Sequence, residues 1–199
     1  MQLKKPWWQR WTLFACLASV ITIADQTSKI WAVGALTDAY SAFPGSKLQS
    51  FWHTAHPRAA RVATVSQNFW HFRYIENPGA AWSFLSNSPS AWRTPFFLIV
   101  SICAMATIVA YFRRTEPTQW LLRSCLASIM GGAVGNFIDR ARLGYVIDFI
   151  DWHYYNSFTW PTFNVADAAI TVGVLVALLE MFLYGGQGES SQANQRTTP

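Results

Sequence analysis

Charged residues are scarce in this sequence. Asp, Glu, Lys and Arg make up 13% of the 199 residues, whereas a soluble domain typically carries about 25%. Hydrophobic residues make up 52% and aromatic residues 16%, and no linker-like stretch divides the chain internally. This composition argues against an ordinary soluble domain and predicts a single polytopic membrane domain over residues 1–184.

The chain also lacks a cluster of basic residues. Its formal net charge is +5, but Lys and Arg are scattered and do not alternate with aromatic residues as they do on a nucleic-acid-binding surface. Basic residues that flank lipid-facing helices account for this charge. We therefore expect no nucleic-acid partner.

Residues that commonly bind metals or form disulfides are few. The three cysteines all lie in apolar segments and are interpreted as small buried hydrophobic residues: Cys16, Cys103 and Cys125. His53, His56 and His71 have no carboxylate or cysteine at ligand spacing, which favours surface histidines. None of the four histidines, His153 included, has an evident partner for a Ser-His-Asp set. The sequence predicts no metal site and no cofactor.

Four long apolar runs are typical of membrane-spanning helices. Each can cross a hydrocarbon layer of about 30 Å, and aromatic residues near their ends resemble interfacial anchors. We expect helices at about residues 11–33, 92–112, 118–138 and 165–184. The remainder, 185–199, is polar and rich in Gly, Ser and Gln, and it is predicted to be a disordered tail.

The first apolar run has a second interpretation, as a secretory signal. A basic start precedes it, and Leu13-Phe14-Ala15-Cys16 loosely matches a lipoprotein cleavage box. The run continues well past Cys16, however, and is long enough to span a bilayer. A retained transmembrane helix is the favoured interpretation.

Four spans place both termini on one side of the membrane. Basic residues mark that side as cytoplasmic by the positive-inside rule, although Arg140 and Arg142 in the opposite loop weaken the count. The basic residues on the cytoplasmic side are Lys4, Lys5, Arg10, Arg113 and Arg114. The long loop that follows the first helix is then expected to face the outside.

That outer segment covers residues 34–91. Its stretch 68–84 is rich in Phe, Trp, Tyr and Ile and is broken by Asn77-Pro78-Gly79, a pattern that predicts a small sheet or hairpin on the membrane surface. The expected fold is an all-α integral membrane protein with four transmembrane helices and a small extracytoplasmic β-rich segment.

Polar residues gather near the outer ends of the expected helices. Asp25 and Lys29 are four residues apart on one helix face, where they can pair. The third and fourth helices contribute Asn136, Asp139, Asn164 and Asp167. Asp167 lies about 5 Å below the start of its helix, at a rise of about 1.5 Å per residue. Ionisable residues inside a span are candidates for function, although a supporting role for the first pair is equally open.

Several of these residues also have structural interpretations. Asn164 and Asp167 can be a helix cap and its reciprocal partner. Asp139 and Arg140 can form an ion pair at a helix end. Residues 131–135 have the GxxxG spacing that is typical of closely packed helices.

Asp148 lies in the apolar stretch 144–150 and has no evident structural role. Asp151 and Asn156 are expected to face water. If Asp148 and Asp167 lie within reach of one water molecule, repulsion between like charges keeps one of them protonated, so that the pair can activate the water and protonate a leaving amine. This arrangement is typical of an aspartic peptidase.

Five blocks in order resemble the lipoprotein signal peptidases, also called signal peptidase II or prolipoprotein signal peptidase. The blocks are DQTSK at 25–29, ENPGAAWSF at 76–84, GGAVGNFIDR at 131–140, GYVIDFID at 144–151 and FNVADAAI at 163–170. One block alone is a weak signal, but five in order, spread over nearly all of residues 11–184, are highly specific. The segment 36–66 departs from the family, because it looks longer than the usual first loop.

The resemblance implies an aspartic endopeptidase that removes signal peptides from bacterial prolipoproteins, cutting just before a diacylglyceryl-modified cysteine without metal or organic cofactor. It implies that Asp148 and Asp167 are the catalytic pair. The positions it implies for substrate binding and support are Asn77, Gly79, Asn136, Arg140, Asn164, Asp25, Lys29 and Asp139. It further implies a multi-pass protein of the bacterial inner membrane, with cytoplasmic termini and an active site near the outer face. We expect a monomer whose partners are the prolipoprotein substrate and membrane lipid.

Such a site can receive a signal helix that lies in the bilayer, while the diacyl chains stay in lipid between the helices. Trp82 and Phe84 of the outer segment are candidates to cover the bound cysteine region. The start of the fourth helix is expected to favour an ionised Asp167 and to leave the shared proton mainly on Asp148.

Two other classes of function remain open from the residues alone. A small transporter could use Asp25, Lys29 and Asp139 as a proton or ion relay, but it would need polar groups staggered through the bilayer, and the inner halves of the helices look mostly apolar. A non-enzymatic scaffold or lipid-binding protein would need only capped and packed helices.

Overall fold

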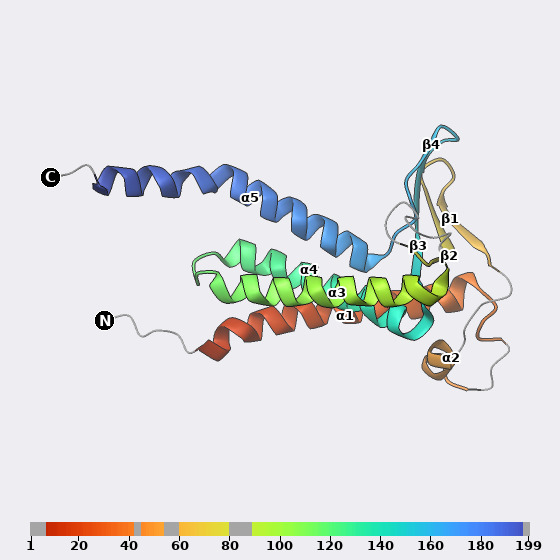
Figure 1. The fold of residues 1–199 in the computed structure, drawn as a ribbon. Coiled ribbons are helices and arrows are strands. Elements are labelled where there is room, and N and C mark those ends of the chain that lie inside the picture. Colours follow the sequence, from red (N-terminus) through yellow and green to blue (C-terminus); the bar gives the residue numbers. More distant parts are fainter. Residues whose placement is uncertain (1–6, 42–44, 54–59, 80–88, 197–199) are drawn as a thin grey trace.

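Four long helices form the body of the protein, and a small sheet lies at one end of them (Figure 1). The computed structural model describes residues 7–41, 45–53, 60–79 and 89–196. The long helices are α1 (Trp7–Leu36), α3 (Ser90–Arg114), α4 (Trp120–Leu143) and α5 (Val165–Arg196). A short helix, α2 (Lys47–His53), lies at the same end as the sheet.

Each long helix contains a stretch that is long and apolar enough to cross a membrane. The four stretches are Trp11–Leu36, Ser90–Arg114, Trp120–Leu143 and Val165–Leu183. Large apolar side chains on them, such as Ile99 and Leu175, are exposed, which suits a surface that faces lipid tails. The prediction of an all-α membrane protein with four transmembrane helices and a small sheet is confirmed.

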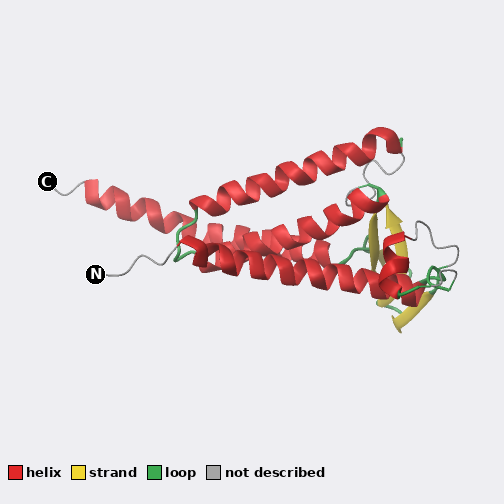
Figure 2. Ribbon diagram, turned by 90° about the horizontal axis from the view of Figure 1, so that it is seen from below, coloured by secondary structure: helices red, strands yellow, loops and turns green. Residues whose placement is uncertain are grey.

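Helix α4 lies at the centre of the helices, because it packs against α1, α3 and α5. Its contacts with α1 and α3 include Phe14, Phe112, Leu126 and Met130, which are all buried. The ring centroids of Phe14 and Phe112 are 4.3 Å apart. The view in Figure 2, turned by 90°, again shows the helices running lengthwise with the strands at one end.

The four strands form one antiparallel sheet in the order β1-β2-β3-β4. Their bounds are β1 Val62–Ser66, β2 Trp70–Asn77, β3 Val146–Tyr154 and β4 Phe158–Thr159. The pairing of β2 with β3 joins the outer segment to the chain that follows α4. Buried residues of α1, α2, β2 and β3, including Leu36, Phe51, Tyr74 and Phe149, form the core beneath this sheet.

The turn from α4 into β3 depends on Gly144. Its φ is +79°, and its N–H donates to the carbonyl of Arg140 at 3.0 Å. A left-handed residue at this position ends the helix without strain only when it lacks a Cβ. The chain can therefore reverse at once and enter β3, which carries Asp148.

The structure corrects the predicted outline in two places. Residues 185–196, part of the stretch predicted to be a disordered tail, form the last part of α5; Gly and Ser weaken a helix, but Gln is a good helix former and residues 185–198 contain no proline. The sheet is not confined to residues 34–91, because half of its strands follow α4. Strand β3 is buried on both faces over most of its length, so its sequence shows no alternation of apolar and polar residues.

Both ends of the described chain lie away from the sheet. Helix α1 begins, and α5 ends, at the end of the molecule opposite the strands (Figure 1). Four spans and this arrangement are consistent with termini on one side of a membrane and the sheet on the other.

Candidate active site

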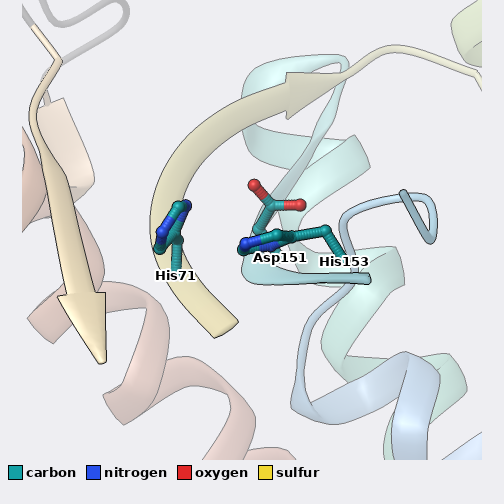
Figure 3. Close-up of side chains that lie close together, drawn as sticks. All are labelled: His71, Asp151 and His153. Atoms are coloured by element: carbon teal, nitrogen blue, oxygen red, sulfur yellow. The ribbon is translucent and has the colours of Figure 1, made fainter. Parts of the chain in front are cut away.

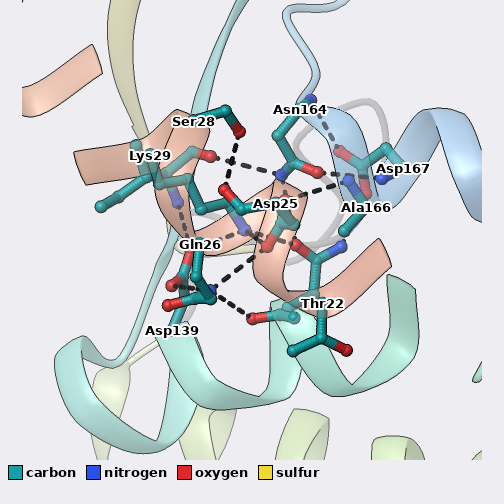
Figure 4. A network of polar contacts seen from close by, with 12 residues as sticks. Thr22, Asp25, Gln26, Ser28, Lys29, Asp139, Asn164, Ala166 and Asp167 are labelled. Carbon is teal, nitrogen blue, oxygen red and sulfur yellow. Dashed lines mark hydrogen bonds and ion pairs between the residues drawn. The ribbon is translucent and has the colours of Figure 1, made fainter. Parts of the chain in front are cut away.

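Polar side chains from α1, α4 and the start of α5 meet where these helices converge (Figure 4). A fully buried lysine lies among them. The ammonium group of Lys29 lies 2.8 Å from a carboxylate oxygen of Asp25 and 2.9 Å from one of Asp139, and all three side chains are inaccessible to solvent. It also donates to Oδ1 of Asn136 at 3.1 Å. Buried charges are tolerated only when they are paired and hydrogen-bonded, as these are.

The same carboxylates hold the elements that carry the catalytic candidates. Oδ1 of Asp25 accepts a hydrogen bond from the backbone N–H of Ala166 at 3.0 Å, in the first turn of α5. Oδ2 of Asp139 accepts one from the backbone N–H of Ile147 at 3.2 Å, in β3. One ion cluster thus positions both the strand of Asp148 and the helix of Asp167.

Gln26 belongs to this cluster, although the sequence did not single it out. Its amide nitrogen lies 3.1 Å from Oδ1 of Asp139, 3.1 Å from the carbonyl of Gly135 and 3.2 Å from Oδ2 of Asp25. The sequence signal that could have identified Gln26 is its position beside Asp25, in a polar stretch of an otherwise apolar helix. Gln26 ties α1 to α4.

Glycines on α4 allow the neighbouring helices to come this close. A Cβ on Gly131 would lie 2.6 Å from the carbonyl oxygen of Ala18, and one on Gly132 would lie 2.5 Å from that of Ala166. A Cβ on Gly135 would lie 2.5 Å from the Asp25 carboxylate. The interpretation of this spacing as close helix packing is supported, and Gly135 also leaves space for the ion cluster.

Asn164 links the two candidate catalytic acids. Its side-chain amide donates to Oδ1 of Asp148 at 2.7 Å. Its side-chain oxygen accepts from the backbone N–H of Asp167 at 2.9 Å, and its own backbone N–H lies 3.4 Å from Oδ2 of Asp167. The reciprocal helix cap considered from the sequence is therefore present, and the same residue also contacts the second acid.

Each acid accepts a further hydrogen bond from a different asparagine. Asn77, at the end of β2, donates to Oδ2 of Asp148 at 3.0 Å, and Asn136, on α4, donates to Oδ1 of Asp167 at 2.8 Å. Asp148 is 1% exposed. Three asparagines thus orient both carboxylates from three separate elements.

Arg140 and Gly79 lie at the edge of this group. The guanidinium of Arg140 donates to the carbonyl of Gly79 at 3.1 Å and stacks over the ring of Phe97, 5.2 Å from its centroid. The backbone N–H of Gly79 in turn donates to Oδ1 of Asn77 at 3.0 Å. A positive charge and a main-chain turn are thereby held beside the acids.

A cavity of about 590 Å³ opens beside the two acids. Both acids and Arg140 line it, together with apolar side chains of α5 that include Ile170 and Val172. Burial, reinforced by the negative charge of Asp167, raises the pKa of Asp148 from 3.8 to about 7. A carboxyl group with such a pKa can act as an acid near neutral pH.

The structure brings together all ten residues that the sequence singled out as catalytic, binding or supporting. Asp139 pairs with Lys29, whereas the guanidinium of Arg140 donates to the carbonyl of Gly79. The expectation that Asp151 faces water is wrong, because the side chain is buried; β3 turns it toward Arg73 and His71 of the neighbouring strand. Asn156 is exposed, as predicted. Trp82 and Phe84, the candidate cover residues, lie outside the described residues.

Comparisons with known proteins agree on one family. The family described as signal peptidase (SPase) II matches residues 17–183. A lipoprotein signal peptidase of Anaeromyxobacter sp. is 38% identical over 96% of this chain and 92% of its own. One from Geobacter metallireducens is 39% identical over 85% of this chain and 90% of its own. A solved structure described as a bacterial membrane enzyme superimposes with a TM-score of 0.67 at 25% identity, covering 88% of this chain and 91% of the other.

Proposed function

The chain belongs to the signal peptidase II family, and we propose that it cuts diacylglyceryl-modified prolipoproteins just before the lipid-modified cysteine, with Asp148 and Asp167 as its catalytic pair. It is a protease, and its membership of this family supports a function in removing signal peptides from prolipoproteins. One observation carries the proposal for the mechanism. Two carboxyl groups, from β3 and α5, are bound by one asparagine at the wall of a cavity.

We assign the shared proton to Asp148 in the resting enzyme. Its pKa, raised to about 7, leaves about half of this carboxyl group protonated in neutral solution. Asp167 lies in the first turn of α5 and accepts a hydrogen bond from Asn136, and the positive end of a helix favours a carboxylate there. The two acids then differ in role: Asp167 is the base and Asp148 is the acid.

In the proposed first step, a water molecule attacks the carbonyl carbon of the scissile peptide bond. Asp167 takes one proton from the water while Asp148 gives its proton to the carbonyl oxygen, which leaves a neutral tetrahedral diol. The C–N bond then breaks, the proton on Asp167 passes to the leaving nitrogen, and a hydroxyl proton returns to Asp148. The products are a signal peptide with a new carboxyl group and a lipoprotein with a free cysteine amine.

Neighbouring polar groups are suited to holding the substrate backbone. The Arg140 guanidinium lines the cavity and is fixed by the Gly79 carbonyl and the Phe97 ring. Asn77, the last residue of β2, also lines the cavity. We propose that these residues bind the main chain on either side of the scissile bond, which aligns its carbonyl with the water.

The apolar wall of the cavity suits a lipid-modified substrate. Ile170 and Val172 on α5 belong to a membrane-spanning stretch. We propose that the diacylglyceryl chains lie against this wall and extend into the bilayer. We further propose that the enzyme is a monomer in the bacterial inner membrane. Its termini lie in the cytoplasm, and the sheet and the active site lie at the outer face.

The cut position is tested by mass spectrometry of the products made by the purified protein in detergent or lipid. The expected products from a diacylglyceryl prolipoprotein are the intact signal peptide and a mature chain that begins with the modified cysteine. A matched substrate without the diacylglyceryl group should be cut at least about tenfold more slowly, because it lacks the group proposed to bind the apolar wall. Equal cleavage of both substrates, or a cut elsewhere, would contradict the proposal.

A further inference from the structure

A second group of chemically active side chains lies on the sheet, outside the peptidase site. His71 on β2 stands directly opposite Asp151 on β3, and His153 follows two residues along the same strand. One potential ligand atom from each residue lies within 4.8 Å of the other two. Figure 3 shows the three side chains close together, with His71 on one strand and Asp151 and His153 on the other. We propose that they bind a divalent transition-metal ion of the zinc class, which ties β2 to β3.

The buried carboxylate of Asp151 supports this assignment. Its Oδ1 is enclosed and has no hydrogen-bond partner among the described residues. Its other oxygen lies 3.4 Å from Nε of Arg73, whose own side chain is 43% exposed. A buried carboxylate oxygen without a partner is costly, and a bound cation would supply the missing interaction.

The tautomer of His153 also suits a metal ligand. Its Nε2 lies 3.2 Å from the carbonyl oxygen of Gln67. A carbonyl only accepts hydrogen bonds, so in this contact Nε2 carries the proton and the neutral ring keeps its lone pair on Nδ1. Histidines that bind metals usually donate their other N–H to such an oxygen, which orients the ring.

The spacing permits coordination after small side-chain rotations. Ligands about 2.0–2.2 Å from a tetrahedral ion lie about 3.4 Å apart, while the three donor atoms here lie within 4.8 Å of one another. The rings of His71 and His153 are already close, with centroids 4.3 Å apart. Both are only partly buried, so rotation about their side-chain bonds can close the difference.

The ligand set indicates the class of ion. Two imidazoles and one carboxylate, with no thiolate, suit Zn²⁺, Co²⁺ or Ni²⁺ better than Mg²⁺ or Ca²⁺, which prefer oxygen ligands. Three protein ligands leave at least one position for water. Trp152, between two of the ligands, lines the cavity of the peptidase site, so the ion would stiffen the strand pair that carries Asn77 and Asp148. The binding itself does not depend on the proposed peptidase mechanism.

The test is a titration of the full-length protein, freed of any histidine tag and treated with a chelator. Co²⁺ is added while its visible absorption is recorded, and Zn²⁺ is then used to displace it. We expect one equivalent to bind. His71→Ala, His153→Ala and Asp151→Asn should each weaken binding at least about tenfold, whereas His53→Ala, a histidine outside the group, should bind as the wild type does.

A second readout separates loss of the site from loss of the fold. Thermal unfolding is followed in EDTA and again with Zn²⁺. Wild type and His53→Ala should unfold at a higher temperature with Zn²⁺, whereas His153→Ala should show a cooperative transition that Zn²⁺ does not shift. Absence of stoichiometric Co²⁺ binding to the wild type, or binding by His71→Ala and His153→Ala with wild-type affinity, would overturn the proposal.

Discussion

Asn164 shows how much one residue contributes to the proposed site. It caps α5 through the backbone N–H of Asp167 and at the same time donates to Asp148. The sequence permitted a purely structural interpretation of Asn164 and Asp167 as a helix cap, and that interpretation is correct but incomplete. A cap residue is held rigidly against the start of its helix. Because the side chain of Asn164 also binds Asp148, it sets the relative position of the two carboxyl groups.

The proton on Asp148 gives the activity an expected pH dependence. The proposed reactive form has Asp148 protonated, and its pKa is raised to about 7 by burial and by the charge of Asp167. That proton is present below about pH 7 and is lost above it, so kcat/KM should fall about tenfold for each pH unit well above 7. The measurement is a pH profile of kcat/KM with the substrate dissolved in detergent.

Asp38→Asn is the matched control for this profile, because Asp38 lies in the loop after α1, outside the proposed site. It should leave the alkaline limb unchanged. A wild-type rate that stays constant from pH 6 to pH 9 would contradict the assignment of the proton, since roughly 99% of a group with a pKa near 7 is ionised at pH 9.

At the scale of elements, the helices were predictable and β3 was not. Long apolar runs determine membrane helices because every backbone polar group must be satisfied inside the segment. Strand β3 needs β2 as its partner, and β2 comes from a distant part of the chain. The burial of Asp151 and its position opposite His71 follow from that pairing, so the sequence near Asp151 could not reveal them.

Gly135 tests the close approach of α4 to α1. A Cβ there would lie 2.5 Å from the Asp25 carboxylate, which cannot retreat without breaking its contacts to Lys29 and Ala166. Gly135→Ala should therefore lower the free energy of unfolding by about 1–3 kcal/mol from overpacking, despite the better helix propensity of alanine. Thermal or chemical unfolding in detergent measures this change.

Gly45→Ala is the control, because the nearest atoms there belong to the flexible side chain of Gln49. It should change stability by less than about 0.5 kcal/mol. If Gly135→Ala were as stable and as active as the control, α4 and α1 would not be as close as the structure shows.

Across the whole molecule, one buried ion cluster connects the parts that form the site. Asp25, Lys29 and Asp139 join α1 to α4, and their carboxylates also bind the starts of α5 and β3. The sequence predicted that these residues lie at one depth. It could not show that Asp25 binds the backbone of α5, because that contact depends on three-dimensional packing.

Lys29→Met should be strongly destabilising. Among the ion pairs of the described residues, Lys29 is the only cation in contact with the two fully buried carboxylates of Asp25 and Asp139. Breaking a buried pair in this way costs about 3–5 kcal/mol, which unfolding in detergent would show. Lys47→Met, at an exposed position in α2, should have little effect.

The triple variant Asp25→Asn/Lys29→Met/Asp139→Asn separates charge from shape. It removes the unpaired charges that Lys29→Met leaves, so it should recover part of the lost stability. If Lys29→Met had the same stability as the wild type, the ion cluster would not hold these elements together.

The central claim is that Asp148 and Asp167 together activate the water. The most direct measurement is the rate of cleavage of a diacylglyceryl prolipoprotein by Asp148→Asn and Asp167→Asn, each shown to be folded by thermal unfolding, beside wild type and Asp38→Asn. Each catalytic variant should lose about 10³-fold or more in kcat/KM, as expected when a member of a catalytic unit is removed, while Asp38→Asn should retain wild-type activity. Cleavage by either folded catalytic variant at the wild-type rate would contradict the claim.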